Sequence, residues 1–167
     1  VCGVGGKTTT SAMAATLLSV YKKNPSYAIG VGKIPSLGLP GRYNKKGEYF
    51  IAEADEYFTS PQDPTPRFMY QSPDIIVLTN IEFDHPDVYK NLEHTFFAFE
   101  QFINKLPYNG LLIASVDNKN NKKFLKKFSC NTTTYGFSKD ADYKIFNHIQ
   151  KKQKNIFSIQ AGDKQIK

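Results

Sequence analysis

Hydrophobic and polar positions along the chain alternate between helical spacing and short continuous apolar runs. Helical spacing predicts two helices, over residues 8–23 and 91–106. Apolar runs within residues 48–56, 73–85 and 107–117 predict strands buried on both faces of a parallel sheet. This alternation predicts an α/β fold, with a mostly parallel sheet flanked by helices.

The remaining segments have weaker patterns. Residues 24–47 are rich in glycine and proline and contain one short apolar run, which predicts a brief strand between loops. From residue 131 onward the runs are short and alternating, which predicts short antiparallel strands at the rim of the sheet. Lys22 and Lys23 are expected in the last turn of the first helix, where cations are favourable.

Composition indicates one folded domain with a basic surface. The chain has 167 residues, is 40% hydrophobic and carries a net charge of +7. Much of the excess is lysine alternating with asparagine, interpreted as a solvated surface; the alternative is a basic patch on a noncatalytic, nucleic-acid-binding module. Cys2 and Cys130 have neither metal-site nor disulfide-framework spacing, and no apolar run is long enough to span a membrane, so a cytoplasmic location is expected.

The first candidate site is the glycine-rich turn that contains Gly3, Gly6, Lys7 and Thr8. It has the short form Gly-x-x-Gly-Lys-Thr of a phosphate-binding loop, with Val1 where the longer pattern has glycine. In such a loop the backbone wraps the phosphates, the ammonium meets the β and γ oxygens, and the threonine hydroxyl ligates magnesium. The alternative is a glycine-rich turn that only caps a helix.

Two polar clusters follow predicted strands. Glu53, Asp55 and Glu56 end the first, and carboxylates this close repel one another unless a cation or a basic group lies among them. The alternative is a solvated loop.

The second cluster follows the next predicted strand, and its polar residues are Asn80, Glu82, Asp84, His85 and Asp87. Here His85 could be an ordinary surface or core histidine, and Asp84 or Asp87 could cap the next helix. The three strand ends are expected on one edge of a parallel sheet, where their side chains together suit a Mg–ATP site.

Five segments, taken in order, resemble the central domain of the Mur ligases. They read "GVGGKTTTSAM", "YFIAEADE", "VLTNIEFDHPDVY", "LPYNGLLIASVDN" and "TTTYGFSKDAD", and the resemblance runs from the first residue to about Tyr143. It implies that residues 1–167 are the central ATP-binding domain of a three-domain enzyme. The loop-bearing strand and the N- and C-terminal domains are then expected outside this sequence, and the isolated chain is expected to be inactive in ligation.

The resemblance also implies a reaction. Mur ligases form an amide bond during the synthesis of peptidoglycan precursors: a substrate carboxylate attacks the γ-phosphate of ATP, and an amine displaces the resulting acyl phosphate. "TYGFSKDAD" favours the branch that joins L-alanine to UDP-N-acetylmuramate, whereas "EADEY" and "EFDH" fit equally the branch that reattaches recycled murein tripeptide. No nucleic-acid or membrane partner is expected, and the sequence does not indicate an oligomeric state.

Residue roles carry over by position. Lys7 would hold the β and γ phosphates, Thr8 and Glu53 the first Mg²⁺, and His85 a second Mg²⁺ between the γ-phosphate and the acceptor carboxylate. Lys7, Glu53 and His85 are the implied catalytic residues, and ATP and Mg²⁺ are the implied cofactors. The implied cofactor-binding residues are Gly3, Val4, Gly5, Gly6, Lys7, Thr8, Thr9 and Asn80.

The chain departs from the family pattern in two places. Val4 stands where the family usually has threonine, and Gly5 where it has histidine or asparagine. Residues 57–70 are longer and richer in proline than the corresponding family segment. Both differences concern the expected substrate end of the site more than its nucleotide end.

Overall fold

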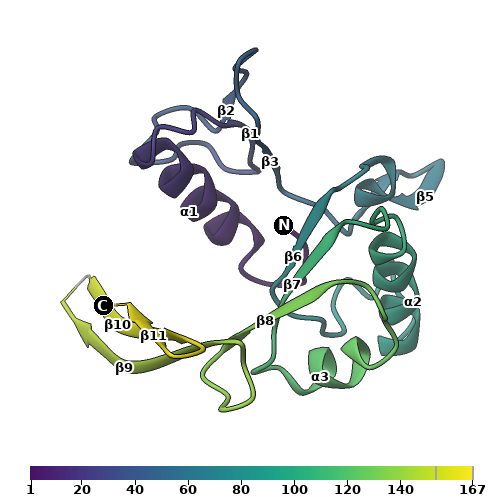
Figure 1. The fold of residues 1–167 in the computed structure, drawn as a ribbon. Helices are drawn as coiled ribbons and strands as arrows, with labels where there is room; N and C mark the ends of the chain where they lie inside the picture. Colours follow the sequence, from purple (N-terminus) through teal and green to yellow (C-terminus); the bar gives the residue numbers. More distant parts are fainter. Residues whose placement is uncertain (153, 167) are drawn as a thin grey trace. The chain divides into compact units, whose positions relative to one another are not determined.

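The computed structural model describes residues 1–152 and 154–166, in two compact units, Val1–Gln71 and Ser72–Lys167 (Figure 1). The first unit contains one α-helix, a three-stranded sheet, a two-stranded sheet and a 3₁₀ turn. Its elements are α1 (Lys7–Val20), β1 (Ser26–Ala28), β2 (Gly41–Arg42), β3 (Phe50–Ala52), β4 (Phe58–Ser60), β5 (Asp63–Pro66) and η1 (Arg67–Tyr70).

In the first unit, α1 packs on the three-stranded sheet. The strand order is β2-β1-β3; β1 pairs with β3 in parallel and with β2 in antiparallel register. Apolar side chains from the helix, from β1 and from the loop that follows it form the core between them: Ala15, Tyr27, Ile29 and Ile34. The brief strand expected within residues 24–47 is therefore present as β1. The short strand β2 was not predicted.

The first helix ends earlier than the sequence predicts. It stops at Val20, and Lys22 takes a left-handed conformation with φ 58°, which ends a helix. Lys22 and Lys23 therefore lie beyond the last turn, and the prediction of a helix to residue 23 with basic residues in that turn is wrong.

Residues 57–70 form the small β4–β5 hairpin followed by η1. The Arg67 guanidinium pairs with Asp55 at 2.9 Å, and the Phe68 amide donates to the Asp55 carbonyl at 3.0 Å. The Phe68 side chain is fully buried. The proline-rich segment is thus a folded element attached to the strand end that carries the carboxylates.

The second unit contains a six-stranded sheet, in the order β11-β10-β9-β8-β7-β6, and two α-helices. Neighbouring strands from β6 to β9 are parallel, whereas β9, β10 and β11 are antiparallel. Its elements are β6 (Ile75–Leu78), α2 (Leu92–Ile103), β7 (Leu111–Ser115), α3 (Lys119–Leu125), β8 (Thr132–Gly136), β9 (Tyr143–Lys151), β10 (Lys154–Ala161) and β11 (Lys164–Ile166).

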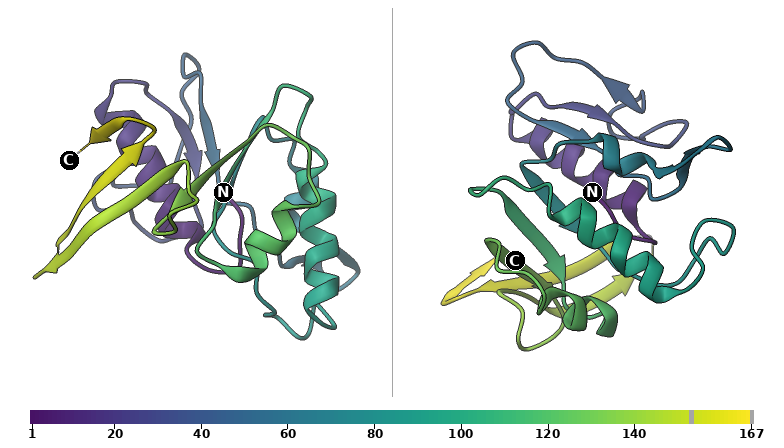
Figure 2. Two further views of the ribbon diagram at one scale, coloured as in Figure 1. Left: turned by 60° about the horizontal axis from the view of Figure 1, so that its bottom comes forward. Right: turned by 90° about the vertical axis from the view of Figure 1, so that its right-hand side faces the viewer.

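Both helices of the second unit lie on the same face of its sheet (Figures 1 and 2). Right-handed crossovers between successive parallel strands give this arrangement, because β6, β7 and β8 are added in one direction. The rings of Phe96 in α2 and Phe124 in α3 stack with their centroids 5.3 Å apart. The two helices therefore pack on each other as well as on the sheet.

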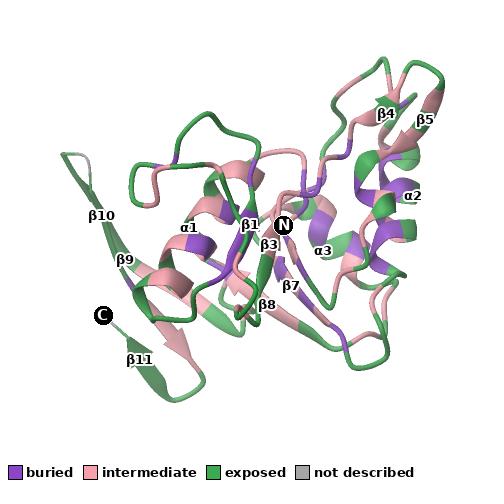
Figure 3. Ribbon diagram, turned by 90° about the horizontal axis from the view of Figure 1, so that it is seen from above, coloured by how far each residue is buried: buried purple, intermediate pink, exposed green. Residues whose placement is uncertain are grey.

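The second predicted helix is confirmed as α2. Figure 3 shows buried stretches along this helix. Its buried residues are Thr95, Phe96, Ala98, Phe99, Phe102 and Ile103. Its N-cap is Asn91, whose side chain accepts from the His94 amide at 2.9 Å. The alternative that Asp84 or Asp87 caps this helix is therefore wrong.

The region after β7 differs most from the prediction. The lysine- and asparagine-rich run forms α3, which its polar composition did not predict, and β8 follows it in parallel with β7. The expected antiparallel arrangement from residue 131 onward is thus wrong for β8 and confirmed for β9, β10 and β11. A helical crossover brings β8 back in the same direction as β7, so a parallel pairing results.

A β-bulge interrupts the long β9–β10 ribbon. The register changes between the pair Ile149–Ile156 and the pair Phe146–Ser158, so β9 has one residue more than β10 between these pairs. Asn147 lies in this stretch with φ 50°, a left-handed conformation. The outer and inner halves of the ribbon therefore have different registers.

Gly136 ends β8 where the backbone touches a carboxylate. Asp117 accepts hydrogen bonds from the amides of Phe137 and Ser138 at 2.8 and 2.9 Å, and a Cβ on Gly136 would lie 2.6 Å from its Oδ1. Gly136 also has φ 151°.

Replacing Gly136 by alanine is expected to lower the free energy of unfolding by about 2 kcal/mol. The added Cβ would strain the backbone at this positive φ and would also overlap with the Asp117 carboxylate. Urea unfolding measures this. Gly162→Ala is the matched control, because Gly162 also has a positive φ but nothing within 4 Å of its would-be Cβ. An equal loss of unfolding free energy in both variants would mean that the overlap with Asp117 does not contribute to the destabilisation.

No helix among residues 1–152 and 154–166 has the length and the apolar character needed to cross a membrane.

Candidate phosphate-binding and metal site

The glycine-rich turn begins beside the end of β3. The Val1 nitrogen donates to the Ala52 carbonyl, and the Ala54 amide donates to the Val1 carbonyl, each at 2.8 Å. This is the bonding of a parallel pair, so the turn leaves a strand position and enters α1 at Lys7. It therefore has the strand–loop–helix geometry of a phosphate-binding loop.

Two glycines shape this turn. Gly3 has φ 135° and Gly6 has φ 79°, and Gly6 occupies the N-cap of α1, where its carbonyl accepts from the Thr10 amide at 3.0 Å. Such backbone angles favour glycine. Gly3, Val4, Gly5 and Gly6 form the loop, and Lys7, Thr8 and Thr9 begin the helix.

Cys2 lies at the start of the loop and is fully buried. Burial raises the pKa of its thiol to about 12. At neutral pH the thiol is therefore protonated and acts as a small apolar packing group.

Glu53 connects Thr8 to the loop after β1. The Thr8 hydroxyl donates to Glu53 Oε1 at 2.7 Å, and the Gly30 amide donates to Oε2 at 2.8 Å. A Cβ on Gly30 would lie 3.2 Å from Oε2, so glycine allows this close approach. Both carboxylate oxygens of Glu53 are thus held in place at the N-terminus of α1.

Lys7 is paired with Glu56. Its ammonium lies 2.8 Å from Oε1 and 2.7 Å from Oε2 of Glu56, and 3.3 Å from the Val4 carbonyl. The side chains are 14% and 2% exposed, so this is a largely buried ion pair. With the pair between Asp55 and Arg67, the carboxylates of this stretch have basic groups among them, as their crowding requires.

The donors at Thr8 and Glu53 fit Mg²⁺. Magnesium takes oxygen ligands at about 2.0–2.1 Å in octahedral geometry, which puts neighbouring ligand oxygens about 2.9 Å apart. The Thr8 and Glu53 oxygens lie 2.7 Å apart. Within the described residues no group of three or more His, Cys, Asp or Glu side chains is placed to hold a metal ion.

Asn80 and His85 belong to the second unit, in the segment after β6. His85 has φ 52°; its amide donates to Asp84 Oδ1 at 2.8 Å, and its carbonyl accepts from the amides of Val88 and Tyr89. Its side chain is 35% exposed. Asn80 Oδ1 accepts from the Thr79 hydroxyl at 3.4 Å.

Asn121 supports the start of this segment, and the sequence analysis missed it. Its Oδ1 accepts from the Ile81 amide at 2.9 Å, and its Nδ2 donates to the carbonyls of Thr79 and Ser115 at 3.1 and 2.9 Å. The residue is fully buried. An asparagine in a polar run gives no signal of this role unless α3 is recognised first.

The structure thus brings together Lys7, Thr8 and Glu53 within the first unit. Asn80 and His85 lie in the second unit and follow β6, which belongs to a different sheet from β3, so the expectation that these strands share one sheet is wrong. The meeting of Asn80 and His85 with the loop stays a prediction.

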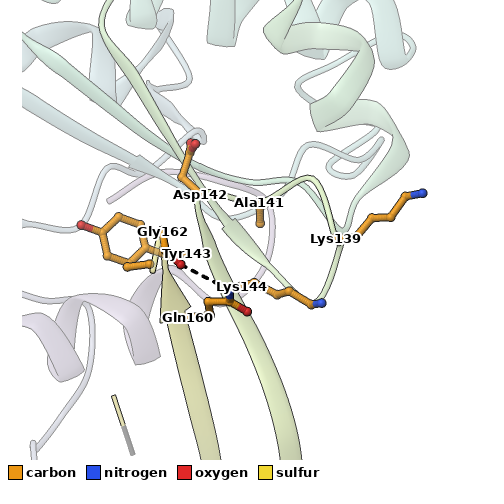
Figure 4. Close-up of a pocket in the computed structure, with 8 residues that line it drawn as sticks. Lys139, Ala141, Asp142, Tyr143, Lys144, Gln160 and Gly162 are labelled. Carbon is orange, nitrogen blue, oxygen red and sulfur yellow. Dashed lines mark hydrogen bonds between the residues drawn. The ribbon is translucent and has the colours of Figure 1, made fainter. Parts of the chain in front are cut away.

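One hollow of about 620 Å³ lies in the second unit, at the start of β9 and the end of β10 (Figure 4). Asp142, on its wall, accepts hydrogen bonds from the amide and the hydroxyl of Thr134 at 2.8 and 2.7 Å. None of the predicted site residues lines this hollow. The lining residues are Lys139, Ala141, Asp142, Tyr143, Lys144, Gln160, Ala161 and Gly162.

The α/β fold and the strand–loop–helix turn with its lysine and threonine define the class of phosphate-binding-loop proteins. A family model described as the Mur ligase middle domain matches residues 1–167. The chain belongs to the Mur ligase family.

Curated relatives are UDP-N-acetylmuramate–L-alanine ligases. That of Geobacter sp. (strain M21) is 40% identical over 144 residues, which cover 86% of this chain and 29% of the relative. That of Hydrogenovibrio crunogenus is 35% identical over 167 residues, which cover 98% of this chain and 34% of the relative. The chain thus spans about a third of the length of these relatives.

Solved structures share the fold. One is the UDP-N-acetylmuramate:L-alanyl-gamma-D-glutamyl-meso-diaminopimelate ligase from Neisseria meningitides, with a TM-score of 0.83 and 24% identity over 98% of this chain and 51% of that one. Another is the MurF ligase from Thermotoga maritima in complex with ADP, with a TM-score of 0.73 and 21% identity over 98% of this chain and 38% of that one. These likenesses confirm the predicted fold class.

Proposed function

We propose that this chain is the middle, ATP-binding domain of a ligase that joins L-alanine to UDP-N-acetylmuramate in peptidoglycan precursor synthesis. The observation that carries the proposal is the hydrogen bond of 2.7 Å between Thr8 and Glu53 at the end of a phosphate-binding loop. It sets two hard oxygen donors side by side where a triphosphate would lie. The curated relatives at 35–40% identity support the choice of substrates.

The loop residues have distinct tasks in this proposal. The backbone of Gly3 to Thr9 wraps the phosphates, and the Lys7 ammonium meets the β and γ oxygens. Thr8 and Glu53 hold one magnesium ion. Bound magnesium neutralises triphosphate charge, so that an anionic carboxylate can approach the γ-phosphorus.

Residues of the second unit complete the proposed site. His85, fixed by the tight turn at Asp84, serves a second magnesium ion, and Asn80 contacts the nucleotide. In the overall reaction the substrate carboxylate takes the γ-phosphoryl group and ADP leaves; L-alanine then displaces phosphate from the acyl carbon. The protein contributes mainly positioning and charge compensation.

Removing the Lys7 ammonium is expected to weaken the binding of Mg–ATP about a hundredfold, the effect of losing charge-assisted hydrogen bonds. The test is calorimetry on the full gene product that carries Lys7→Met together with Glu56→Gln, a combination that leaves no buried charge unpaired. Glu56→Gln alone is the matched control, because it keeps the ammonium.

Equal affinities of these two variants would contradict the proposal. A ligation assay then separates the substrates. Phosphate release with UDP-N-acetylmuramate and L-alanine supports the proposed reaction, and release only with murein tripeptide assigns the chain to the recycling branch.

A further inference from the structure

The hollow at the start of β9 is a feature of the second unit that the proposed function does not use. Its volume of about 620 Å³ lies in the range of small-molecule sites. Lys139 and Ala141 line it from the loop before β9, Lys144 from β9 and Gln160 from β10 (Figure 4). Polar side chains from three segments can therefore contact one ligand there.

One wall of the hollow is held in place by contacts of the chain itself. Asp117 accepts from the amides of Phe137 and Ser138 at 2.8 and 2.9 Å. The Lys122 ammonium donates to the Ser138 hydroxyl at 3.0 Å and pairs with Asp140 at 3.4 Å. These contacts fix the loop before β9 without any ligand, and a preformed site binds without the entropic cost of ordering its walls.

Lys144 and Gln160 lie side by side on neighbouring strands. They are register partners in the β9–β10 pair, which puts their Cβ atoms about 4.5–5.5 Å apart on one face of the ribbon. Both residues are half-buried. Gln160 Nε2 donates to the Gly162 carbonyl at 3.3 Å, which leaves its second N–H for a ligand. Among residues 1–152 and 154–166 no group pairs with the Lys144 ammonium.

The charges of the lining favour an anion. Lys144 and Lys139 contribute two ammonium groups; Lys139 is exposed, and Figure 4 shows its side chain extending outward from the loop. The acidic side chain of the lining is Asp142, and hydrogen bonds from Thr134 hold its pKa below the ordinary value, so it is ionised at neutral pH. The two positive charges exceed this one, and residues 139–167 as a whole contain seven lysines and three aspartates.

We propose that this hollow binds a small phosphorylated molecule through the Lys144 ammonium and the Gln160 amide, with Lys139 at its entrance. The lining residues include no arginine, the side chain that matches a planar carboxylate with two parallel hydrogen bonds. Lysine binds phosphate as a point charge, and phosphate oxygens accept from several directions. No residue of the phosphate-binding loop lines the hollow, so this inference goes beyond the proposed function and does not rest on it.

The test follows backbone amides by NMR in the full gene product, with the phosphate-binding loop filled by magnesium and a nonhydrolysable ATP analogue. Sodium phosphate is the probe, and sodium acetate and sodium chloride at the same ionic strength are the comparison. Phosphate is expected to shift the amide signals of residues 141–144 and 160–162 along a saturating curve. Acetate and chloride are expected to leave these signals in place.

Two variants of the lining should change the phosphate affinity in opposite directions. Lys144→Gln is expected to weaken binding about tenfold, because it removes a charge-assisted hydrogen bond. Asp142→Asn is expected to strengthen binding about threefold, because it removes a like charge from the wall and keeps an acceptor oxygen for Thr134. Lys151→Gln is the matched control, because it removes a charge from an exposed position of β9 outside the lining.

No saturable shift with phosphate, or an equal shift with acetate, overturns the inference. Equal weakening by Lys144→Gln and Lys151→Gln overturns it as well, since binding would then be a general attraction to the lysines of the β9–β10 ribbon. If Lys144→Gln disturbs amide signals throughout the protein, Lys139→Gln takes its place with the same expected direction. A protein that binds no ATP analogue refutes the proposed function alone, because the amides of the hollow report on phosphate independently of the loop.

Discussion

Asn121→Leu is expected to lower the free energy of unfolding by about 3–5 kcal/mol. The side chain satisfies the Ile81 amide and the carbonyls of Thr79 and Ser115, and each buried backbone group left without a partner costs about 1–3 kcal/mol. Leucine has a similar volume, so the loss reports hydrogen bonding more than cavity formation. Urea unfolding, followed by circular dichroism, measures it.

Asn120→Ala is the matched control for this prediction. Asn120 makes one comparable contact, from Nδ2 to the Ile81 carbonyl at 2.9 Å, and it is half-buried. Its loss should cost about 1 kcal/mol. An Asn121→Leu variant as stable as Asn120→Ala would show that the three backbone groups find other partners.

Lys7→Met is expected to lower the free energy of unfolding by about 3–5 kcal/mol, because it leaves Glu56 buried without its counter-charge. Adding Glu56→Gln to the same chain should restore most of the loss, since the second change removes the stranded charge. A double-mutant cycle with urea unfolding gives the coupling between the two residues.

A surface lysine provides the comparison for this second prediction. Lys127 pairs with Glu100 at 3.1 Å, and the two side chains are 52% and 35% exposed. Lys127→Met should therefore change stability by less than about 1 kcal/mol. Similar losses in Lys7→Met and Lys127→Met, or no rescue by Glu56→Gln, would contradict a buried, energetically coupled pair.

Elements with strong periodicity could be predicted from the sequence. The aromatic spacing of α2 and the apolar runs of β6 and β7 identify these elements in the sequence. Burial alternates along both strands, and Ile75 is exposed, so the expectation that they are buried on both faces is wrong. The phosphate-binding loop could also be predicted, because its glycines, lysine and threonine are adjacent in the chain.

Elements in which only a few residues are buried could not be predicted from the sequence. In α3 only Asn121 and Phe124 are buried, and one of them is polar, so a run of lysines and asparagines conceals the helix. Missing α3 led to the wrong direction for β8, since the crossover that makes β8 parallel runs through this helix. The end of α1 depends on the backbone conformation of Lys22, which residue type does not reveal.

The candidate site also has features that the sequence predicts and features that it does not. The sequence indicated that the carboxylates near Glu53 need positive charge among them, but it could not assign partners. Glu56 pairs with Lys7 and Glu53 accepts from Thr8 across 49 and 45 positions of the chain, whereas Asp55 pairs with Arg67 across 12. These pairings depend on tertiary structure. The Arg67 contact in particular requires the folding of residues 57–70.

The bulge near Asn147 has a consequence for how the β9–β10 ribbon can vary. Two residues of β9 lie between these pairs where β10 has one, so the bulge keeps Ile149 opposite Ile156 in spite of the extra residue. Loss of one residue at this point would restore regular pairing and leave Ile149 on the same side of the ribbon. The bulge is therefore a place where the length of β9 can change by one residue without exchanging the two surfaces of the outer half.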